Sequence, residues 1–269
     1  MRKWNGIKSI GIFIGILLVV ILIVWLVNRN IVRVDGFDGL NREPIIPLDI
    51  YQTWKTKDLP PKMQECVETL KRQNPEFRHH LYDDADCYQF IKDHFDPEVA
   101  EAYDALIPGA YKADLWRYCV LYKRGGIYLD IKYCNVGDFK LISLTDREYF
   151  VRDIPSSGEG IYNAFMICLP GNKKLENCIR RVVENVQNRF YGNSCLEPTG
   201  PLMMKKEFTK EEIMDIKNTL VFDDSKNEER NICLHGKPIL RVYKGYYESE
   251  NTIHQENHIH MWKKRKMYK

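Results

Sequence analysis

The sequence predicts an α/β domain with a largely parallel sheet, preceded by a single membrane-spanning helix. Strand-like and helix-like segments alternate between residues 45 and 133, the rhythm typical of this class. One of the helices ends at a Gly-Gly pair and leads directly into an apolar strand that carries an acidic residue near its end. The third observation is an uncharged run of eighteen residues near the N-terminus.

Residues 10–27 form this run, and every member is apolar or glycine. A helix of that length, rising about 1.5 Å per residue, spans most of a hydrocarbon core of about 30 Å. No small-x-small cleavage pattern follows it, although a cleaved signal peptide, the alternative, would need one. We therefore predict a cytosolic tail at residues 1–9 and an uncleaved anchor. The protein is then a single-pass type II protein of an ER- or Golgi-type membrane, with its folded part in the lumen.

Downstream of the anchor we predict a short polar stem at residues 28–44, a folded domain at 45–262 and a basic tail at 263–269. A basic run of this kind could bind phosphate or act as a nuclear signal. We interpret it as a solvated tail, because charge runs most often are.

The domain is predicted to open with a strand at residues 45–54, a helix at 61–73 and a second strand at 77–82. Pro61 suits the first turn of that helix, and an Asn-Pro pair stops it. Asp83 or Asp84 is placed to cap the helix that follows the second strand. The first helix has one apolar face, formed by Met63, Cys66, Val67 and Leu70.

Further helices are predicted at residues 110–123, 173–190 and 209–218. The first of these ends at a Gly-Gly pair, which is typical of a helix C-terminus, and a strand at 127–133 follows it. A short strand is predicted at 160–162. The chain after residue 221 is too mixed to assign.

Composition excludes some classes of function. Forty Lys and Arg residues against thirty-seven Asp and Glu give a net charge of +3, too slight to indicate a nucleic-acid partner. Eight cysteines are scattered without any CxxC pair, which argues against a zinc ribbon or a thioredoxin-type motif. A luminal location permits disulfides, but spacing does not give their pairing. Cys119 falls on the packing face of its helix and is expected in the core.

The candidate functional residues lie in the helix at 110–123 and the strand after it. Asp114 and Arg117 are three residues apart and share a helix face. Alternation along the strand puts Asp130 and Lys132 on one face, near the carboxyl end where open α/β sheets bind ligands. The other strand face is apolar and suits packing against a helix layer: Ile127, Leu129 and Ile131.

These residue types fit the chemistry of a diphosphate-linked sugar. Asp130 can hold a divalent metal, Asp114 can accept hydrogen bonds from sugar hydroxyls, and Arg117 can donate to hydroxyl or phosphate oxygens. The alternative makes Asp114 and Arg117 a helix surface pair that contributes only a few tenths of a kcal/mol.

The segment resembles glycosyltransferase family 32, the sugar-binding family named for its DXD motif, which is also similar to large clostridial-type toxin glucosyltransferases. The resemblance starts from a D-x-x-R-Y helix at Asp114, Arg117 and Tyr118, a Gly-Gly cap and a Y-x-D strand ending. It continues in the opening I-P-x-x-I-x-Q-T-W strand at 45–54, a T-G-P turn and a terminal H-x-H-x-W cluster. Together these motifs span residues 45 to 262 in the family's order.

This resemblance implies a single-domain GT-A fold, a Rossmann-like nucleotide-sugar-binding domain, and a hexosyltransferase activity. The donor is then a GDP- or UDP-sugar, the acceptor a glycan or a lipid, and the anomeric configuration is retained. The short stem keeps the site near the bilayer, which permits lipid-linked acceptors. We see no obvious nucleophilic carboxylate, so same-face displacement is our hypothesis.

The family's motifs also imply roles for individual residues. The catalytic set is Asp130, Arg117 and Lys132. The substrate-binding set is Trp54 near the base, Asp114, Arg117 and Tyr118 at the sugar, Asn163 after the short strand, Gly200 in the T-G-P turn, and Trp262. The metal set is Asp130, His258 and His260, with Mn²⁺ or Mg²⁺ as the cofactor. Trp54 is equally suited to the core, and the two histidines to an ordinary surface.

One departure from the family pattern matters, because Lys132 stands where the second aspartate is expected. An ammonium there opposes a divalent ion, by about 4 kcal/mol per pair of unit charges at 4 Å with an effective dielectric near 20. Three alternatives follow: Lys132 replaces the metal, points past it, or marks lost activity. We expect a transferase with weakened or altered metal dependence.

Two other classes of function compete with the transferase. The first is a non-catalytic nucleotide-sugar-binding protein, which the lysine favours. The second is a carbohydrate hydrolase, which needs two acids facing each other across a cleft. The sequence offers only Asp153 and Glu159, in an unremarkable stretch, so we rank the hydrolase last.

Overall fold

The computed structural model describes residues 43–153, 160–217, 219–226, 229–247 and 258–269. The predicted anchor at 10–27, its tail and nearly all of the stem lie outside these residues. Within the described ranges, no helix has both the length and the apolar character that a membrane crossing requires.

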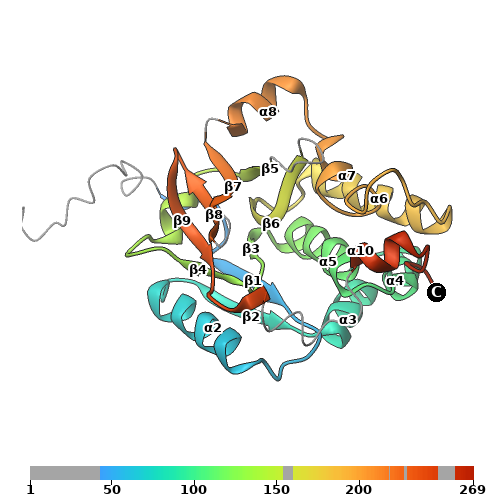
Figure 1. Cartoon of the computed structure of the whole chain (residues 1–269), viewed down its shortest axis with the longest axis horizontal. Helices are drawn as coiled ribbons and strands as arrows, with labels where there is room; N and C mark the ends of the chain where they lie inside the picture. The colour runs from blue at the N-terminus through green and yellow to red at the C-terminus, as the bar shows by residue number, and fades with distance from the viewer. Residues whose placement is uncertain (1–42, 154–159, 218, 227–228, 248–257) are drawn as a thin grey trace, which may run out of the picture. The chain divides into compact units, whose positions relative to one another are not determined.

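One mixed sheet runs through the domain, in the order β2-β1-β3-β6-β5-β7-β8-β9-β4 (Figure 1). Its strands are β1 (Asp49–Thr53), β2 (Arg78–Tyr82), β3 (Gly126–Leu129), β4 (Tyr133–Asn135), β5 (Tyr149–Asp153), β6 (Gly160–Cys168), β7 (Leu220–Lys226), β8 (Glu229–Leu234) and β9 (Lys237–Val242). Strand β1 pairs in parallel with both β2 and β3, and β5 pairs in parallel with β7. The other pairings are antiparallel. The α/β class is confirmed, but the prediction of a largely parallel sheet is wrong beyond β3.

Most helices gather on one side of the sheet, around α5 (Figure 1). The helices are α2 (Pro61–Gln73), α3 (Asp84–His94), α4 (Pro97–Ala105), α5 (Gly109–Arg124), α6 (Lys173–Gln187), α7 (Pro201–Lys205), α8 (Lys210–Lys217) and α10 (His258–Lys263), with a 3-10 turn at Leu141–Leu144. Helix α5 lies at the centre of this layer and contacts α3, α4 and α6 as well as β1, β3 and β6. Its central residues from Asp114 to Leu121 are all buried, including the predicted core residue Cys119.

The local signals at the helix ends are confirmed. Asp83 caps α3, because its side chain accepts a hydrogen bond from the backbone N–H of Asp86, and the Asp86 side chain accepts one from the backbone N–H of Asp83. Gly125 ends α5 with a φ of +64°, a conformation that strains other residues. A Cβ there would lie 2.7 Å from Pro170, so the close approach of α5 to the loop after β6 also requires glycine.

The strand after α5 is shorter than predicted. It ends at Leu129, and residues 130–132 form a turn in which the backbone N–H of Tyr133 donates to the carbonyl of Asp130. The predicted packing of its faces is also wrong. Tyr128, on the face assigned to the ligand, packs edge-on against Trp116 of α5. Both faces of β3 are therefore buried, as expected for a strand in the middle of a covered sheet.

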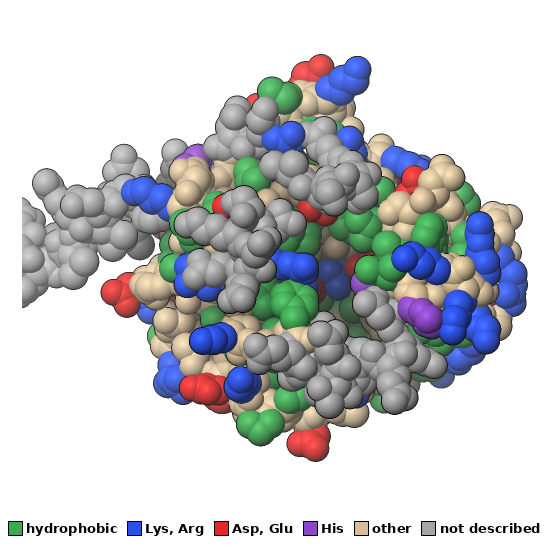
Figure 2. All heavy atoms as spheres, viewed as in Figure 1, with side chains coloured by type: hydrophobic (Ala, Val, Ile, Leu, Met, Phe, Trp, Pro, Cys, Tyr) green, Lys and Arg blue, Asp and Glu red, His purple; other side chains and the backbone are tan. Residues whose placement is uncertain are grey.

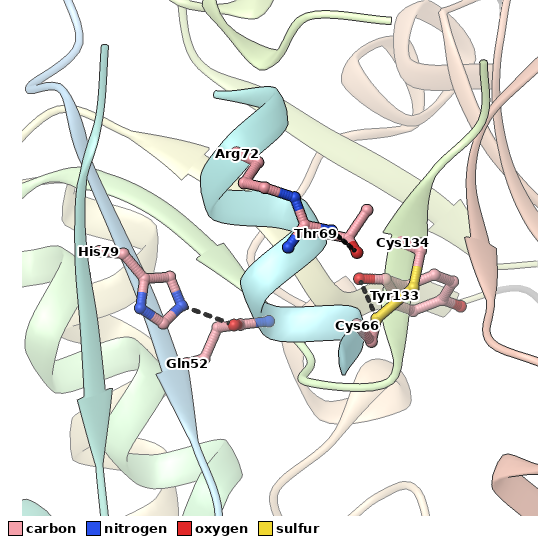
Figure 3. Close-up of a disulfide and its surroundings, with 7 residues drawn as sticks. All are labelled: Gln52, Cys66, Thr69, Arg72, His79, Tyr133 and Cys134. Atoms are coloured by element: carbon pink, nitrogen blue, oxygen red, sulfur yellow. Dashed lines mark hydrogen bonds between the residues drawn. A yellow bond between two sulfur atoms is a disulfide. The ribbon is translucent and has the colours of Figure 1, made fainter. Parts of the chain in front are cut away.

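A disulfide between Cys66 and Cys134 joins α2 to β4 (Figure 3). Cys134 lies two residues after Lys132 in the same turn-and-strand segment. Strand β4 pairs only with β9 among the described strands, at the edge of the sheet. The disulfide thus ties this edge strand to α2, the helix that connects β1 to β2 along the chain.

Candidate active site

Arg117 is the centre of a group of charged side chains on α5 and at the end of β3. Its guanidinium Nη2 lies 3.5 Å from Asp114 Oδ1 and 3.3 Å from Asp130 Oδ1, so one cation stands between two carboxylates. Its other nitrogens donate to the backbone carbonyls of Ala113 and Asn163. The residue is only 5% exposed, and this full set of acceptors is what a buried guanidinium requires.

Asp114 is held from three sides. Its Oδ1 accepts a hydrogen bond of 2.9 Å from the amide of Asn163, and its Oδ2 accepts one of 2.7 Å from the hydroxyl of Thr199. Burial raises the pKa of Asp114, while Arg117 and these two donors oppose the rise. Asp114 is only 8% exposed and Arg117 only 5%. The alternative that these two residues form an ion pair on the helix surface is therefore wrong.

Asp130 is also clamped, by a different set of partners. The Lys132 ammonium lies 2.7 Å from Oδ2, and the Tyr128 hydroxyl donates to Oδ1 at 2.8 Å. Burial alone would raise the pKa of Asp130, but Lys132 and Arg117 hold it below its usual range. The side chains of Asp130 and Lys132 remain 19% and 16% exposed, so a ligand can reach this pair.

We call Asp114, Arg117, Asp130 and Lys132 the charge cluster. Aromatic rings support both of its cations. Arg117 lies 4.4 Å from the ring centre of Tyr128, and Lys132 lies 5.6 and 5.9 Å from the ring centres of Tyr133 and Tyr162. Figure 2 shows the face viewed in Figure 1, hollowed near its middle, with Lys or Arg and hydrophobic side chains around the hollow.

The charge cluster does not fit a divalent ion as it stands. Metal ligation needs a carboxylate oxygen about 2.0–2.1 Å from Mg²⁺, yet both oxygens of Asp130 already contact donors, one of them a cation. Among the described residues, no three His, Cys, Asp or Glu side chains gather as a metal site. The predicted metal set of Asp130, His258 and His260 is therefore not assembled in this structure. The positive charge of Lys132 would also repel a divalent cation at Asp130.

Three predicted substrate-binding residues lie next to the charge cluster. Tyr118 accepts a hydrogen bond from Asn163 and donates to the carbonyl of Thr199. Asn163 lies within β6 rather than after a short strand. Gly200 precedes α7, and a Cβ on it would lie 3.4 Å from Asp114 Oδ2.

Trp54, a fourth predicted substrate-binding residue, directly follows β1. Strand β3, which pairs in parallel with β1, ends just before Asp130. Trp54 and Asp130 therefore both lie at the carboxyl edge of this parallel pair.

The terminal cluster is positioned by other contacts. His258 packs against Tyr111 at a ring distance of 5.9 Å, and His260 is exposed. The indole of Trp262 donates to the carbonyl of Tyr191 at 2.6 Å and packs against the core. Helix α10 contacts α5, which also carries Asp114, so this cluster is anchored to the site's own helix.

Two residues of the site were not predicted as such. Thr199 belongs to the T-G-P turn, but its hydroxyl contact with Asp114 depends on a fold that brings together residues eighty-five positions apart. Tyr128 belongs to the Y-x-D motif, and its hydroxyl contact with Asp130 follows from strand alternation, which puts residues i and i+2 on one face.

Comparison with known proteins identifies the same region. Residues 60–154 match the family model described as a glycosyltransferase sugar-binding region containing a DXD motif. This interval contains all four members of the charge cluster. The predicted resemblance to the DXD-motif family is thereby confirmed.

Named relatives support this result. The chain is 35% identical over 91 residues to an initiation-specific alpha-1,6-mannosyltransferase of Candida albicans, covering 32% of this chain and 24% of that protein. It is 31% identical over 166 residues to inositol phosphoceramide mannosyltransferase 3 of Schizosaccharomyces pombe, covering 61% of this chain and 45% of that protein. The chain thus spans less than half the length of these relatives.

A solved structure supports the fold alone. The chain superposes on the PaToxG glycosyltransferase with a TM-score of 0.51 at 17% identity, covering 66% of this chain and 76% of that one. The α/β glycosyltransferase fold is therefore confirmed for the described domain.

Proposed function

We propose that this chain, which carries the sugar-binding region of the DXD-motif glycosyltransferases at residues 60–154, transfers a hexose from a nucleotide diphosphate sugar to a glycan or lipid acceptor. The names of the similar fungal proteins favour mannose as the hexose. A GDP- or UDP-sugar is the donor class.

The observation that carries this proposal is the position of Arg117 between Asp114 and Asp130. Asp114 presents a carboxylate to sugar hydroxyls, and its orientation is fixed by Thr199 and Asn163. Charge-assisted hydrogen bonds of this kind are short and directional, which suits recognition of a hexose. Asp130 and Lys132, which keep some exposure, stand at the reacting end.

In this proposal Lys132 and Arg117 stabilise the negative charge that develops on the leaving diphosphate. Preorganised cations in a site of low dielectric are worth far more than the same cations in water. The reaction is attack of an acceptor hydroxyl on the anomeric carbon. Both carboxylates are already engaged by donors, which favours same-face displacement with retention over a covalent intermediate. A trapped covalent sugar–protein adduct would exclude that course.

We infer weakened or altered metal dependence from the same geometry. Mn²⁺ or Mg²⁺ would supply Lewis-acid charge at the diphosphate in the DXD pattern, where Lys132 now supplies a fixed ammonium. His258 and His260 stay candidates for a ligand role only if α10 moves toward Asp130.

The proposed location is the luminal side of an ER- or Golgi-type membrane, reached through the anchor predicted at residues 10–27. The Cys66–Cys134 disulfide supports it, because disulfides persist in oxidising compartments. The similar fungal ceramide mannosyltransferase supports a lipid-linked acceptor.

A second candidate is a protein that binds the nucleotide sugar without transferring it. The 2.7 Å contact of Lys132 with Asp130 favours it. An Asp130 carboxylate that is paired with this ammonium is no longer available to coordinate the metal ion that the DXD pattern implies. Equilibrium binding of a donor without turnover would support this candidate against the transferase.

The test is a panel of UDP- and GDP-sugars, GDP-mannose included, offered to the full chain in detergent with a lipid acceptor and with a mannoside acceptor. We expect nucleoside diphosphate release with one donor. Asp130→Asn should lower it at least about 100-fold, because it removes the partner that positions two cations. Asp104→Asn, which removes an exposed acid that pairs with Lys269, should leave it unchanged. Failure of every donor, or full activity in Asp130→Asn, would reject the proposal.

A further inference from the structure

A second opening in the domain lies at the edge of the sheet away from the charge cluster. It has a volume of about 460 Å³, within the range of small-ligand sites, and is lined by Pro47, Asp49, Tyr51, Arg78, His80, His94, Lys123 and Arg124. Asp49 begins β1, and its carbonyl lies against Gly126, which begins β3. Asp130 follows the other end of β3. The two sites therefore occupy opposite edges of the parallel pair.

The lining is strongly basic. Three of its side chains are Lys or Arg, and the one acid, Asp49, is already committed. Asp49 accepts from Arg78 at 2.8 Å and contacts His80 at 2.7 Å. The ring of His80 in turn stacks on Tyr51 at 5.0 Å. These contacts hold Arg78 and His80 of β2 at the rim of the opening. They leave no carboxylate in the lining to pair with Lys123 and Arg124 of α5.

Lys123 and Arg124 lie in the last turn of α5 and are exposed. Both side chains contact aromatic rings: the Lys123 ammonium lies 5.3 Å from the ring centre of Phe95, and the Arg124 guanidinium lies 5.4 Å from that of Phe90. Within the described part of the chain, neither has a carboxylate partner. The charged end of each side chain therefore lies over an aromatic ring, and both residues remain exposed to solvent.

Cations at a helix C-terminus also complement the helix dipole, and this is the simpler explanation of Lys123 and Arg124. It does not account for Arg78 and His80, which come from a strand and face the same opening. Nor does it account for His94, which comes from the end of a second helix and contacts the carbonyl of Phe90. Basic side chains from three separate elements thus converge on one hollow.

We propose that this hollow, which we call the basic pocket, is a second site that binds a phosphate group, carried either by a soluble molecule or by a lipid headgroup. Arg78 and Arg124 can each donate paired hydrogen bonds to phosphate oxygens, and Lys123 adds a point charge. The site is independent of the proposed transfer reaction, since it shares no residue with the charge cluster.

The experiment is calorimetric titration of the full chain in an uncharged detergent, at constant ionic strength and without any sugar nucleotide. One probe is inorganic phosphate, and the other is short-chain phosphatidic acid below its micellar concentration. The test variant is Lys123→Gln with Arg124→Gln, and Arg78→Gln tests the pocket from β2. The control is Lys71→Gln with Arg72→Gln, an equal charge change in the last turn of α2.

We expect at least one probe to bind the wild type and the control, and to bind both pocket variants about tenfold or more weakly, because charge-assisted contacts are lost. Binding of inorganic phosphate assigns a soluble ligand, and binding of phosphatidic acid alone assigns a lipid headgroup. No binding by either probe overturns the proposal, and so does equal weakening in the control. Binding that is lost in Lys132→Gln but kept in the pocket variants would place the phosphate in the charge cluster and likewise overturn it.

Discussion

The ammonium of Lys132 lies 2.7 Å from Oδ2 of Asp130, at the position where the DXD pattern has its second acid. Together with Arg117 and Asp114 this makes a group of two cations and two carboxylates, whose formal charges cancel without a metal ion. A buried charge is costly unless it is paired, and here each charge has a partner. We propose that Lys132 supplies the positive charge that a divalent ion would supply in the DXD pattern, in a cluster that is electrically balanced.

The first prediction exchanges that lysine for the acid it replaces. We expect wild-type transfer to survive chelation, and Lys132→Asp to be active only with added Mn²⁺. The change removes the ammonium that opposes a divalent ion and restores a second carboxylate beside Asp130. Lys132→Ala should lower kcat about 100-fold or more with no rescue by metal, as expected when a charge-stabilising group is lost. Transfer rates with and without chelator measure both effects.

Lys264→Asp is the control for this exchange, because it makes the same charge change at an exposed position after α10. Its response to chelator should match that of the wild type. Complete loss of wild-type transfer on chelation would refute the replacement of metal by Lys132.

The second prediction concerns the glycine beside Asp114. In Gly200→Ala the new Cβ would lie 3.3 Å from the carbonyl of Leu196 and 3.4 Å from Asp114 Oδ2, so the turn or the carboxylate must shift by a few tenths of an ångström. We expect kcat/KM to fall about tenfold, since small displacements of positioning groups are expensive in rate. Steady-state kinetics with the donor that the nucleotide-sugar panel selects measure the change.

Gly109→Ala is the matched control, because its Cβ would meet nothing within 4 Å at the start of α5. It should keep full activity and gain up to about 1 kcal/mol in the free energy of unfolding. Equal activity in the two variants would show that the turn at Gly200 does not position Asp114.

The parts of the fold that local signals determine could be predicted from the sequence. Helix α2 has one apolar face, α3 has the Asp83 cap, and α5 ends where glycine takes a positive φ. Helices α2 and α5 both lie within a few residues of their predicted bounds. These features depend on interactions within one turn of helix. They do not depend on where the rest of the chain lies.

Long-range pairing could not be predicted in the same way. Strand β6 lies antiparallel between β3 and β5, and β4 pairs with β9 across more than one hundred residues. Local sequence patterns therefore predicted neither the mixed sheet nor the hairpins formed by β7, β8 and β9. Within the site, Asp114 and Arg117 were found from their spacing, whereas Thr199 reaches Asp114 only through the tertiary fold.

The third prediction concerns the disulfide that links Cys66 to Cys134. It closes a loop of sixty-eight residues that includes the whole charge cluster. Loop-closure entropy for such a length corresponds to about 4 kcal/mol of stability in the oxidised protein. We expect the reductant dithiothreitol, or Cys134→Ala, to lower the free energy of unfolding by about 2–4 kcal/mol. Denaturant unfolding with and without reductant measures it.

Cys195→Ala controls for the loss of a thiol, because Cys195 is half-buried and forms no disulfide. Its unfolding should keep the full response to reductant, whereas Cys134→Ala should show none. A wild type that unfolds at the same denaturant concentration in both conditions would contradict the link.

The fourth prediction is a pH dependence of stability that arises at His79. This residue on β2 is half-buried, and its Nε2 lies 2.7 Å from Oε1 of Gln52, to which it donates (Figure 3). Burial, with smaller effects from Lys71 and His80, lowers the pKa of His79 to about 4. An unfolded chain has a histidine pKa near 6.5, so below that pH the unfolded state binds a proton that the folded state does not.

Stability from this group is therefore complete above about pH 6.5, and declines as the pH falls toward 4, by up to about 3 kcal/mol. In His79→Gln the amide can still donate to Gln52 but cannot titrate, so we expect a shallower loss of stability across that window. His260→Gln, a change of an exposed histidine, controls for the removal of one imidazole. Urea unfolding at pH 7, 5.5 and 4 compares the three proteins, and parallel curves for wild type and His79→Gln would show that His79 does not cause the decline.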